Sequence, residues 1–406
     1  MKILNTILNS SCQRILWFTH REIPKHPRLV HVPRSTTPSC ISVASMVLCL
    51  ISSVWAQPSP NVSPFASGLK YPRGLKFGPD GNLYVAEAGA GGSMSTALIC
   101  PQVEFVPGPY KGGFSARISK ISPDGLTITT VADNLPSAVE SLGDVIGIAD
   151  VAFIGHKLYA LSSGGGCSHG LAGTSAEVLQ VNADGTTTSV ANLSHFQQTH
   201  PTLAPHSGPG YEPDGSWYSM ISVRDALFAV EPNHDELDMI DTDGNIRRVA
   251  DISATQGHIV STACVYDGDF YVGNLGLFPI VEGSSKILKI TPSGQVKVFA
   301  TGFTTILGLA MDHRHRLYVL ENTTGTYLFP TPGTGKVLRV NHSGHVKEIA
   351  TGLSLPTGMT FGPDDDLYVS NWGFGPPDMG EIVRIKVPGL HPHRDHDDRD
   401  EDDDSD

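Results

Sequence analysis

The stretch GLKFGPDGNLYVAEA, residues 74–88, predicts a β-hairpin. Apolar and aromatic strand formers flank a Pro-Asp-Gly turn, and Glu87 stands where the second strand should end. A variant of this stretch, GMTFGPDDDLYVSNW, recurs at residues 358–372. A hairpin that recurs over such a distance predicts a fold built from repeated units.

The second strand of this hairpin occurs six times. The copies share an apolar-aromatic-small-small-polar pattern: LYVAE (83–87), LYALS (158–162), LFAVE (227–231), FYVGN (270–274), LYVLE (317–321) and LYVSN (367–371). Their last residues lie 75, 69, 43, 47 and 50 positions apart, and the shorter spacings match a propeller blade of four strands. Further hairpins turning at Asp-Gly or Ser-Gly follow the first five copies, at 117–132, 177–191, 236–250, 286–300 and 336–350. The sequence therefore predicts an all-β protein, a six-bladed β-propeller of four antiparallel strands per blade spanning residues 57–390.

The last blade lacks an outer strand of its own. After the sixth copy the chain offers a single further strand, EIVRIKVPG at 381–389. The segment NVSPFASGL, 61–69, is similar to the outer strands VKVFATGF and VKEIATGL of other blades. We expect this N-terminal strand to close the ring by pairing into the last blade, which removes an exposed sheet edge. A β-sandwich, the alternative, would not repeat one hairpin six times.

The lengths of the connections differ between the two ends of the strands. Turns inside the hairpins are short, whereas the insertions follow a second strand or precede a first strand, at 88–116, 163–176, 192–215, 275–285, 322–335 and 372–380. In an up-and-down blade both of these connections lie on one face, here called the loop-bearing face, and the turns lie on the bare face. Binding residues are concentrated on loops held by a rigid scaffold, so the loop-bearing face is the candidate functional surface.

The two ends of the chain differ in composition from the body. Residues 1–56 carry six Lys or Arg and end in the apolar run ISVASMVLCLISSVWA, which is too short to span a bilayer. With Val54-Trp55-Ala56 as a cleavage site, they predict a signal peptide with a long n-region, cut after Ala56. A start site upstream of the natural one and an uncleaved anchor are the alternatives. The acidic tail 391–406 is predicted to be disordered.

The net charge and the predicted secretion limit the kinds of partner that the protein can have. The net charge of −13 leaves no basic footprint, which excludes nucleic acid and anionic membrane as partners. We expect a secreted monomer without membrane insertion after cleavage, whose partner is a small molecule or a secreted or cell-surface protein. Cys100 and Cys167 lie in loops of adjacent blades and predict a disulfide, while Cys264 reads as a buried thiol. Four sequons predict glycosylation, at Asn61, Asn192, Asn322 and Asn341.

The last residue of each repeated strand is the main candidate for chemistry. The six are expected near the central opening on the loop-bearing face: Glu87, Ser162, Glu231, Asn274, Glu321 and Asn371. Converging oxygen ligands suit a hard divalent cation such as Ca²⁺, with Glu87, Asn274, Glu321 and Asn371 as its ligands. Arg73 lies beside them and could pair with Glu87 or hold an anionic ligand. The alternative is that these side chains cap the strand ends and hydrogen-bond neighbouring backbone.

Several segments carry a family resemblance. The stretches GLKFGPDGNLYVAEAG, VEPNHDELDMID and GLFPIVEGSSKI, with GLAMDHRHRLYVLE, are similar to those of the ScyD/ScyE family of secreted or periplasmic propellers. The chain departs from that family in having Ser216-Trp217 where Asn-Pro is usual, and His313-Arg314-His315 in place of a Pro-Asp-Gly turn. The family carries no settled catalytic residues that could be transferred.

A more distant resemblance is to the six-bladed NHL-repeat, gluconolactonase-like and strictosidine-synthase-like proteins. In the lactonases a Glu, two Asn and an Asp hold a divalent cation that polarises the lactone carbonyl and activates water. By this resemblance Glu87, Asn274, Glu321 and Asn371 would imitate that set. We therefore predict ligand or partner binding on the loop-bearing face around the channel. The alternatives are a metal-dependent hydrolase of the lactonase type and a non-catalytic protein-interaction module.

Overall fold

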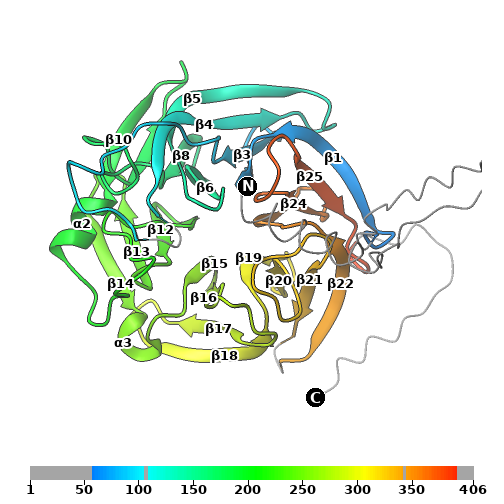
Figure 1. Ribbon diagram of the computed structural model, residues 1–406. Helices are drawn as coiled ribbons and strands as arrows, with labels where there is room; N and C mark the ends of the chain where they lie inside the picture. The colour runs from blue at the N-terminus through cyan, green and yellow to red at the C-terminus, as the bar shows by residue number, and fades with distance from the viewer. Residues whose placement is uncertain (1–56, 105–107, 342–343, 391–406) are drawn as a thin grey trace, which may run out of the picture. The chain divides into compact units, whose positions relative to one another are not determined.

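The computed structural model describes residues 57–104, 108–341 and 344–390. Six antiparallel sheets follow one another around a central axis (Figure 1). The predicted all-β, six-bladed propeller is therefore confirmed. The predicted signal peptide, its cleavage site and the acidic tail lie outside the described residues. No helix in the described ranges is long and apolar enough to cross a bilayer.

Each blade is a four-stranded meander read outward from the axis. The first strands are β2 (Pro72–Phe77), β7 (Ile148–Ile154), β11 (Ser219–Val223), β15 (Ser261–Asp267), β19 (Ile306–Met311) and β23 (Gly358–Phe361). Each of them contacts the first strand of the next blade, and β2 contacts β23, so these strands form the innermost ring.

The second strands carry the repeated motif of the sequence. They are β3 (Leu83–Glu87), β8 (Lys157–Ser162), β12 (Ala226–Glu231), β16 (Asp269–Asn274), β20 (Leu317–Glu321) and β24 (Leu367–Asn371). The third strands are β4 (Lys111–Ile121), β9 (Glu177–Val181), β13 (Glu236–Asp241), β17 (Ser285–Ile290), β21 (Gly335–Val340) and β25 (Gly380–Ile385).

The outer strands complete the blades. They are β5 (Ile128–Val139), β10 (Thr187–Asn192), β14 (Ile246–Asp251), β18 (Val296–Phe303), β22 (Val346–Leu353) and, for the last blade, β1 (Val62–Leu69). The first blade has an extra two-residue strand, β6 (Val145–Ile146), paired with the end of β5. Two short helices, α2 (Leu193–Thr199) and α3 (Ser253–Gln256), occur between blades.

The predicted closure of the ring is present. Strand β1 pairs antiparallel with β25, from Val62 opposite Ile385 to Leu69 opposite Gly380. The residues before β1 also bind blade 5, because the Ser59 amide donates to the Thr351 carbonyl at 3.1 Å. The N-terminal strand thus joins the last blade and contacts the blade before it.

The aromatic residue of the repeated motif fastens neighbouring blades together. Tyr84 of β3 packs edge-to-face on Phe153 of the second blade, with ring centroids 5.0 Å apart. Tyr318 of β20 meets Phe361 of the last blade in the same way, at 5.0 Å. Such pairs contribute beyond the area they bury. The repeat of the aromatic position in the sequence is therefore explained by packing between blades.

Candidate functional site

The predicted ring of strand-end residues is buried and does not line the channel. All six side chains are almost fully excluded from solvent. Four of them accept a hydrogen bond from a backbone N–H just before the first strand of their own blade: Glu87 from Lys70 at 2.5 Å, Glu231 from Ser216 at 2.8 Å, Glu321 from Thr304 at 2.6 Å and Asn371 from Ser354 at 2.8 Å. These are the contacts of strand-end caps, the alternative that the sequence left open.

Glu87 is the most extensively bonded of the six. Its carboxylate accepts from Arg117 through two nitrogens, at 2.7 and 3.0 Å, and from the Ser119 hydroxyl at 2.5 Å. Arg117 lies directly opposite Glu87 on β4. The pair suggested between Arg73 and Glu87 was wrong, because Arg117 is the partner of Glu87 and Arg73 has another partner.

The remaining contacts test whether these residues fit a shared cation. The side-chain oxygen of Asn274 accepts from the Lys286 backbone amide at 2.8 Å. The side-chain nitrogen of Asn274 donates to the Ile259 backbone carbonyl at 2.9 Å. Lys336 forms an ion pair with Glu321 at 3.4 Å. Within the described residues no three His, Cys, Asp or Glu side chains converge closely enough to hold a metal. As arranged, the residues predicted for Ca²⁺ do not fit a common ion.

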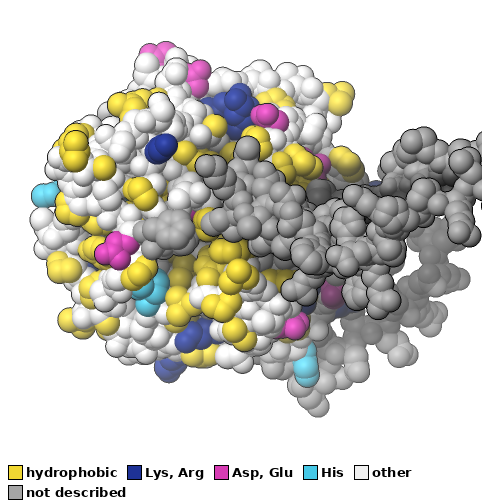
Figure 2. Space-filling model, in the orientation of Figure 1, with side chains coloured by type: hydrophobic (Ala, Val, Ile, Leu, Met, Phe, Trp, Pro, Cys, Tyr) yellow, Lys and Arg dark blue, Asp and Glu magenta, His cyan; other side chains and the backbone are white. Residues whose placement is uncertain are grey.

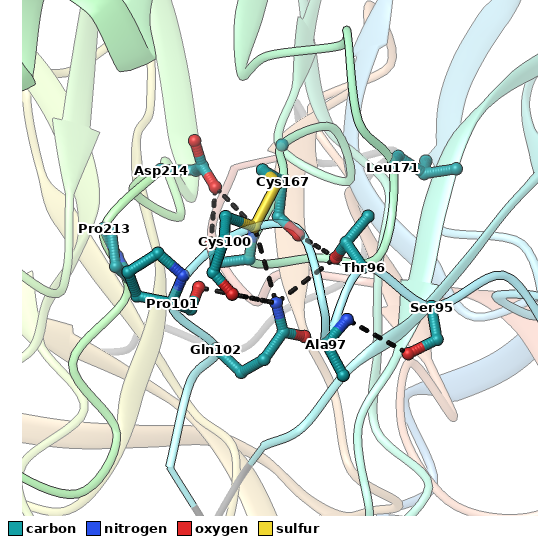
Figure 3. The surroundings of a disulfide bond; sticks show 12 residues. Ser95, Thr96, Ala97, Cys100, Pro101, Gln102, Cys167, Leu171, Pro213 and Asp214 are labelled. Carbon is teal, nitrogen blue, oxygen red and sulfur yellow. Dashed lines mark hydrogen bonds between the residues drawn. A yellow bond between two sulfur atoms is a disulfide. The ribbon is translucent and has the colours of Figure 1, made fainter.

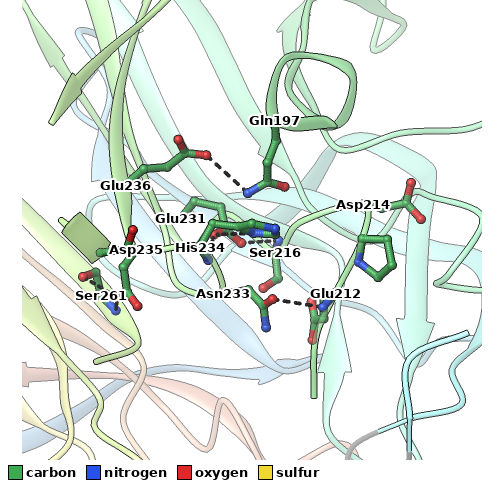
Figure 4. A network of polar contacts seen from close by, with 12 residues as sticks. Gln197, Glu212, Asp214, Ser216, Glu231, Asn233, His234, Asp235, Glu236 and Ser261 are labelled. Carbon is green, nitrogen blue, oxygen red and sulfur yellow. Dashed lines mark hydrogen bonds and ion pairs between the residues drawn. The ribbon is translucent and has the colours of Figure 1, made fainter. Parts of the chain in front are cut away.

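On blade 3 the strand-end glutamate joins a wider polar network (Figure 4). Glu231 accepts from the His234 amide at 2.5 Å and meets the His234 ring at 3.2 Å. Burial would raise the pKa of Glu231, but His234 and the amide hydrogen bonds hold it below its usual value. Next along the chain, Glu236 accepts from the Gln197 amide at 3.2 Å. The Gln197–Glu236 bond ties the third strand of blade 3 to helix α2.

Arg73 occupies the mouth of the channel on the loop-bearing face. It lies in the first strand β2, is buried, and donates to Asp144 at 2.8 Å and to the Val145 carbonyl at 2.5 Å. The side chain of Asp144 is 41% exposed, against 9% for that of Arg73. Burial lowers the pKa of Arg73, but the Asp144 carboxylate more than offsets this and raises it. The guanidinium is therefore a fixed positive charge facing a half-exposed partner.

Tyr218 reaches across the same mouth. It precedes β11 of blade 3, and its hydroxyl donates to the Thr357 carbonyl of blade 6 at 2.8 Å. The Thr357 hydroxyl in turn donates to the Pro72 carbonyl of blade 1 at 2.6 Å. Because blades 3 and 6 stand opposite each other in a six-membered ring, Tyr218 spans the opening. Burial raises the pKa of the Tyr218 hydroxyl, so it stays a neutral donor.

Below Tyr218 lies a small cavity in the channel, of about 30 Å³. Asp150 lines it and accepts from the Val151 and Met220 amides, each at 2.8 Å. Burial raises the pKa of Asp150 to about 6. A Cβ on Gly74 would stand 1.9 Å from an Asp150 oxygen, which explains the glycine that opens the repeated hairpin. Cys264, confirmed as a buried free thiol, lines the same cavity.

The loops of blades 1 and 2 are fastened by the predicted disulfide (Figure 3). Cys100 and Cys167 are bonded, with Cα atoms 6.3 Å apart, and the Thr96 hydroxyl donates to the Cys167 carbonyl. The next residue, Ser168, donates through its amide and hydroxyl to Asp214, at 2.7 and 2.6 Å. Three loops of the loop-bearing face are thereby joined at one point.

A buried triad lies beside this disulfide. The Tyr110 hydroxyl donates to Glu212 at 2.9 Å, and the His169 ring stands 3.5 Å from the other Glu212 oxygen. Burial lowers the pKa of His169, but Glu212 more than compensates and raises it. None of the three could be found from the sequence, because no motif marks residues that meet from separate loops. Each comes from a different insertion, so the triad reinforces the same junction.

Two neighbouring loops carry exposed apolar residues on the same face. We call them the LFP loops, because residues 277–279 and 328–330 both read Leu-Phe-Pro. Phe278 and Phe329 are about half exposed, with ring centroids 6.0 Å apart. The loops are joined by two backbone hydrogen bonds between Ile280 and Tyr327, at 2.8 and 3.2 Å. Figure 2 shows hydrophobic side chains gathered on the face turned to the viewer, over β15 to β20.

The four sequons differ in the availability of the amide nitrogen that would receive a glycan. Asn322 is buried and donates that nitrogen to the Pro356 carbonyl at 2.8 Å, and Asn61 donates it to two carbonyls. Asn192 is exposed, and among the described residues its side chain bonds only through its oxygen, which accepts from the His195 backbone amide at 2.8 Å. Asn341 is also exposed and accepts through its oxygen, from the His345 amide at 2.8 Å.

If the chain is secreted from a glycosylating cell, we expect a glycan at Asn192 and none at Asn322. A sugar on Asn322 would have to fit at a buried side chain, whose nitrogen already donates to the Pro356 carbonyl. Mass spectrometry of peptides after deglycosylation in ¹⁸O-water would mark each occupied site. Labelled Asn322 with unlabelled Asn192 would contradict this ranking.

Comparisons with known proteins reach the fold only. No protein-family model and no curated protein matches the sequence. A Bacteroides thetaiotaomicron protein of unknown function has a TM-score of 0.52 at 12% identity, over 81% of this chain and 77% of its own. A Thermus thermophilus protein named for a proposed glucose dehydrogenase (oxidoreductase) activity has a TM-score of 0.50 at 15% identity, over 80% and 99%.

A Xanthomonas campestris gluconolactonase has a TM-score of 0.49 at 12% identity, over 80% of this chain and 89% of its own. At such identities a structural likeness shows the propeller fold, and function has to be argued from the site. The resemblance to the ScyD/ScyE family stays a prediction.

Proposed function

We propose that the protein binds a ligand at the channel mouth of the loop-bearing face. The observation that carries this is the convergence of polar groups from three blades at one opening. Arg73 comes from blade 1, Tyr218 from blade 3 and Thr357 from blade 6. A few convergent polar groups within otherwise apolar surroundings are typical of small-molecule sites.

The rigidity of the surrounding loops supports the same proposal. The Cys100–Cys167 disulfide and the Ser168–Asp214 hydrogen bonds hold three insertions in place around this face. Loops that are ordered before binding lose less conformational entropy when a ligand arrives. Secretion, predicted from residues 1–56, would place such a site in contact with extracellular metabolites.

A thermal-shift screen of charged and neutral metabolites tests the proposal. We expect at least one compound to raise the unfolding temperature of the wild type, and to lose this effect in Arg73→Gln and Tyr218→Phe. Asp364→Asn is the control. Asp364 lies away from the mouth and forms an ion pair with Arg384, with a nitrogen–oxygen distance of 2.7 Å. The proposal fails if every active compound acts equally on the mouth variants and on the control.

A second candidate is protein interaction through the LFP loops. Both loops expose a Leu and a Phe side chain, the two Phe ring centroids lie 6.0 Å apart, and no charged residue occurs in 322–335. Exposed apolar surface of this kind marks interaction sites. A protein partner whose affinity is lost in Phe278→Ser but unchanged in Arg73→Gln would favour this second candidate over the first.

The lactonase alternative would need a cation that the strand-end ring, as arranged, does not fit. Ca²⁺ or another divalent ion is therefore used only as an added reagent in the test of this alternative. Metal-dependent lactone turnover by the purified chain would favour this alternative, and a mouth ligand that binds unchanged in the presence of EDTA would favour the first candidate.

A further inference from the structure

We propose that the ligand of the channel mouth is a carboxylate. It displaces the Asp144 side chain and pairs with Arg73 in its place. This inference rests on the proposed function, since it names the chemical class that the channel mouth would accept. It starts from the unequal exposure of the two partners. The Arg73 side chain is 9% exposed and that of Asp144 is 41% exposed.

Arg73 cannot follow Asp144 into solvent. Its backbone belongs to β2, its carbonyl accepts from the Ser370 hydroxyl at 2.6 Å, and its guanidinium also donates to the Val145 carbonyl at 2.5 Å. A buried charge without a counter-ion is costly, so Arg73 is rarely without an anion beside it. A guanidinium in a fixed position binds carboxylates well, because its donors match the two oxygens.

Asp144, in contrast, is carried by a turn that holds itself together. The Glu140 amide donates to the Asp144 carbonyl at 2.9 Å, and the Asp144 and Leu142 amides both donate to the Glu140 carboxylate at 3.0 Å. The Asp144 side chain adds one further bond to the turn, because it accepts from the Val145 amide at 2.8 Å. The carboxylate can therefore leave Arg73 at the cost of that one bond, while the Glu140 contacts keep the turn in shape.

The turn is also an addition to the blade. It connects β5 to the two-residue strand β6, which the other five blades lack among the described residues. Within the described part of the chain, the pair between Asp144 and Arg73 is the only side-chain ion pair that joins this turn to the innermost ring. An internal anion on a solvent-facing turn lowers the apparent affinity for an external anion, since only the fraction of molecules with a free Arg73 can bind.

Benzoate, with benzamide as its neutral analogue, is the probe for this exchange. We expect Asp144→Asn to bind benzoate roughly tenfold more tightly than the wild type by calorimetric titration, because the competing charge is gone. The affinity for benzamide should be the same in Asp144→Asn as in the wild type. Asp364→Asn, the same change beside another arginine, should bind benzoate like the wild type. Adding Arg73→Gln to Asp144→Asn should abolish the gain.

The inference is overturned if Asp144→Asn and Asp364→Asn bind benzoate within twofold of each other, or if the double variant keeps the tighter binding. If Asp144→Asn does not fold, the wild type decides. In NMR spectra benzoate must then shift the Arg73 Nε–H signal and the Asp144 carboxyl carbon together, and unmoved signals would refute the exchange. A neutral compound that binds through Tyr218 and is indifferent to Asp144→Asn would refute this inference while leaving the proposed function standing.

Discussion

Replacing Glu87 with alanine should lower the free energy of unfolding by about 3–5 kcal/mol, the cost of breaking a buried ion pair from one side. Glu87 is fully buried and receives bonds from Lys70, Arg117 and Ser119. Its removal leaves a backbone amide, a hydroxyl and a largely buried guanidinium without their acceptor. The loss should therefore appear in stability, whether or not the protein is catalytic.

Urea unfolding of Glu87→Ala beside Glu348→Ala measures this effect. Glu348 is exposed on the outer strand β22, so its removal should change stability by less than about 0.5 kcal/mol. The same experiment with EDTA separates a cap from a metal ligand. If Glu87 held a structural Ca²⁺, EDTA would destabilise the wild type and leave the variant unchanged. Equal stability of Glu87→Ala and Glu348→Ala would contradict the role described for Glu87.

The second large effect concerns Asp238, in the third strand of blade 3. It is fully buried, and neither carboxylate oxygen has a hydrogen-bond partner among the described residues; the Trp217 indole faces it outside normal hydrogen-bond geometry. Burial, followed by the neighbouring charge of Glu236, raises the pKa of Asp238 well above its usual value. Burial also raises the pKa of Glu236 to about 7.

The sign of the pH dependence follows from these directions. A carboxyl whose pKa is higher in the folded state stabilises the fold fully below its unfolded pKa, and the stabilisation is lost as the pH rises toward the folded pKa. Above the unfolded pKa of an aspartate, about 4, the unfolded chain has released the Asp238 proton, whereas the folded chain keeps it until the pH approaches its own raised pKa. In that range the wild type should lose stability relative to Asp238→Asn as the pH rises, with a limiting slope of about 1.4 kcal/mol per pH unit.

Urea unfolding at pH 5, 6 and 7 tests this for Asp238→Asn, with Asp225→Asn as the control. Asp225 lies exposed in the turn between β11 and β12. The free energy of unfolding of Asp238→Asn minus that of the wild type should increase with pH. The same difference for Asp225→Asn should stay constant. Parallel pH profiles for all three proteins would show that Asp238 ionises normally in the folded state.

The fold was predictable from the sequence because the strand pattern and its packing repeat from blade to blade, although the spacing between the repeats differs. The aromatic position of LYVAE and LYVLE recurs since Tyr84 and Tyr318 contact the next blade. The β1–β25 closure was predictable from the likeness of residues 61–69 to other outer strands. The disulfide followed because Cys100 and Cys167 sit in equivalent loops of adjacent blades.

The site was less predictable, for a geometric reason. The six recurring polar residues end the second strands, whereas the first strands form the wall of the channel. Their side chains therefore bond within the blade instead of meeting at the axis. Asp144 could not be anticipated as the partner of Arg73, because it stands on the extra turn between β5 and β6, outside the repeat. Tyr218 precedes the first strand of its blade and belongs to no recurring motif.

The pairing of β1 with β25 has a consequence for the order of folding. Val62 meets Ile385 across the whole sequence of the propeller, so the last blade cannot form until β25 has been synthesised. Until then β1 carries an unpaired edge, and contacts of such high sequence separation form slowly. Five blades can assemble during synthesis, but the ring remains open and prone to wrong pairing until its end. Truncation before β25 should therefore give a chain that aggregates, even though most of its blades are intact.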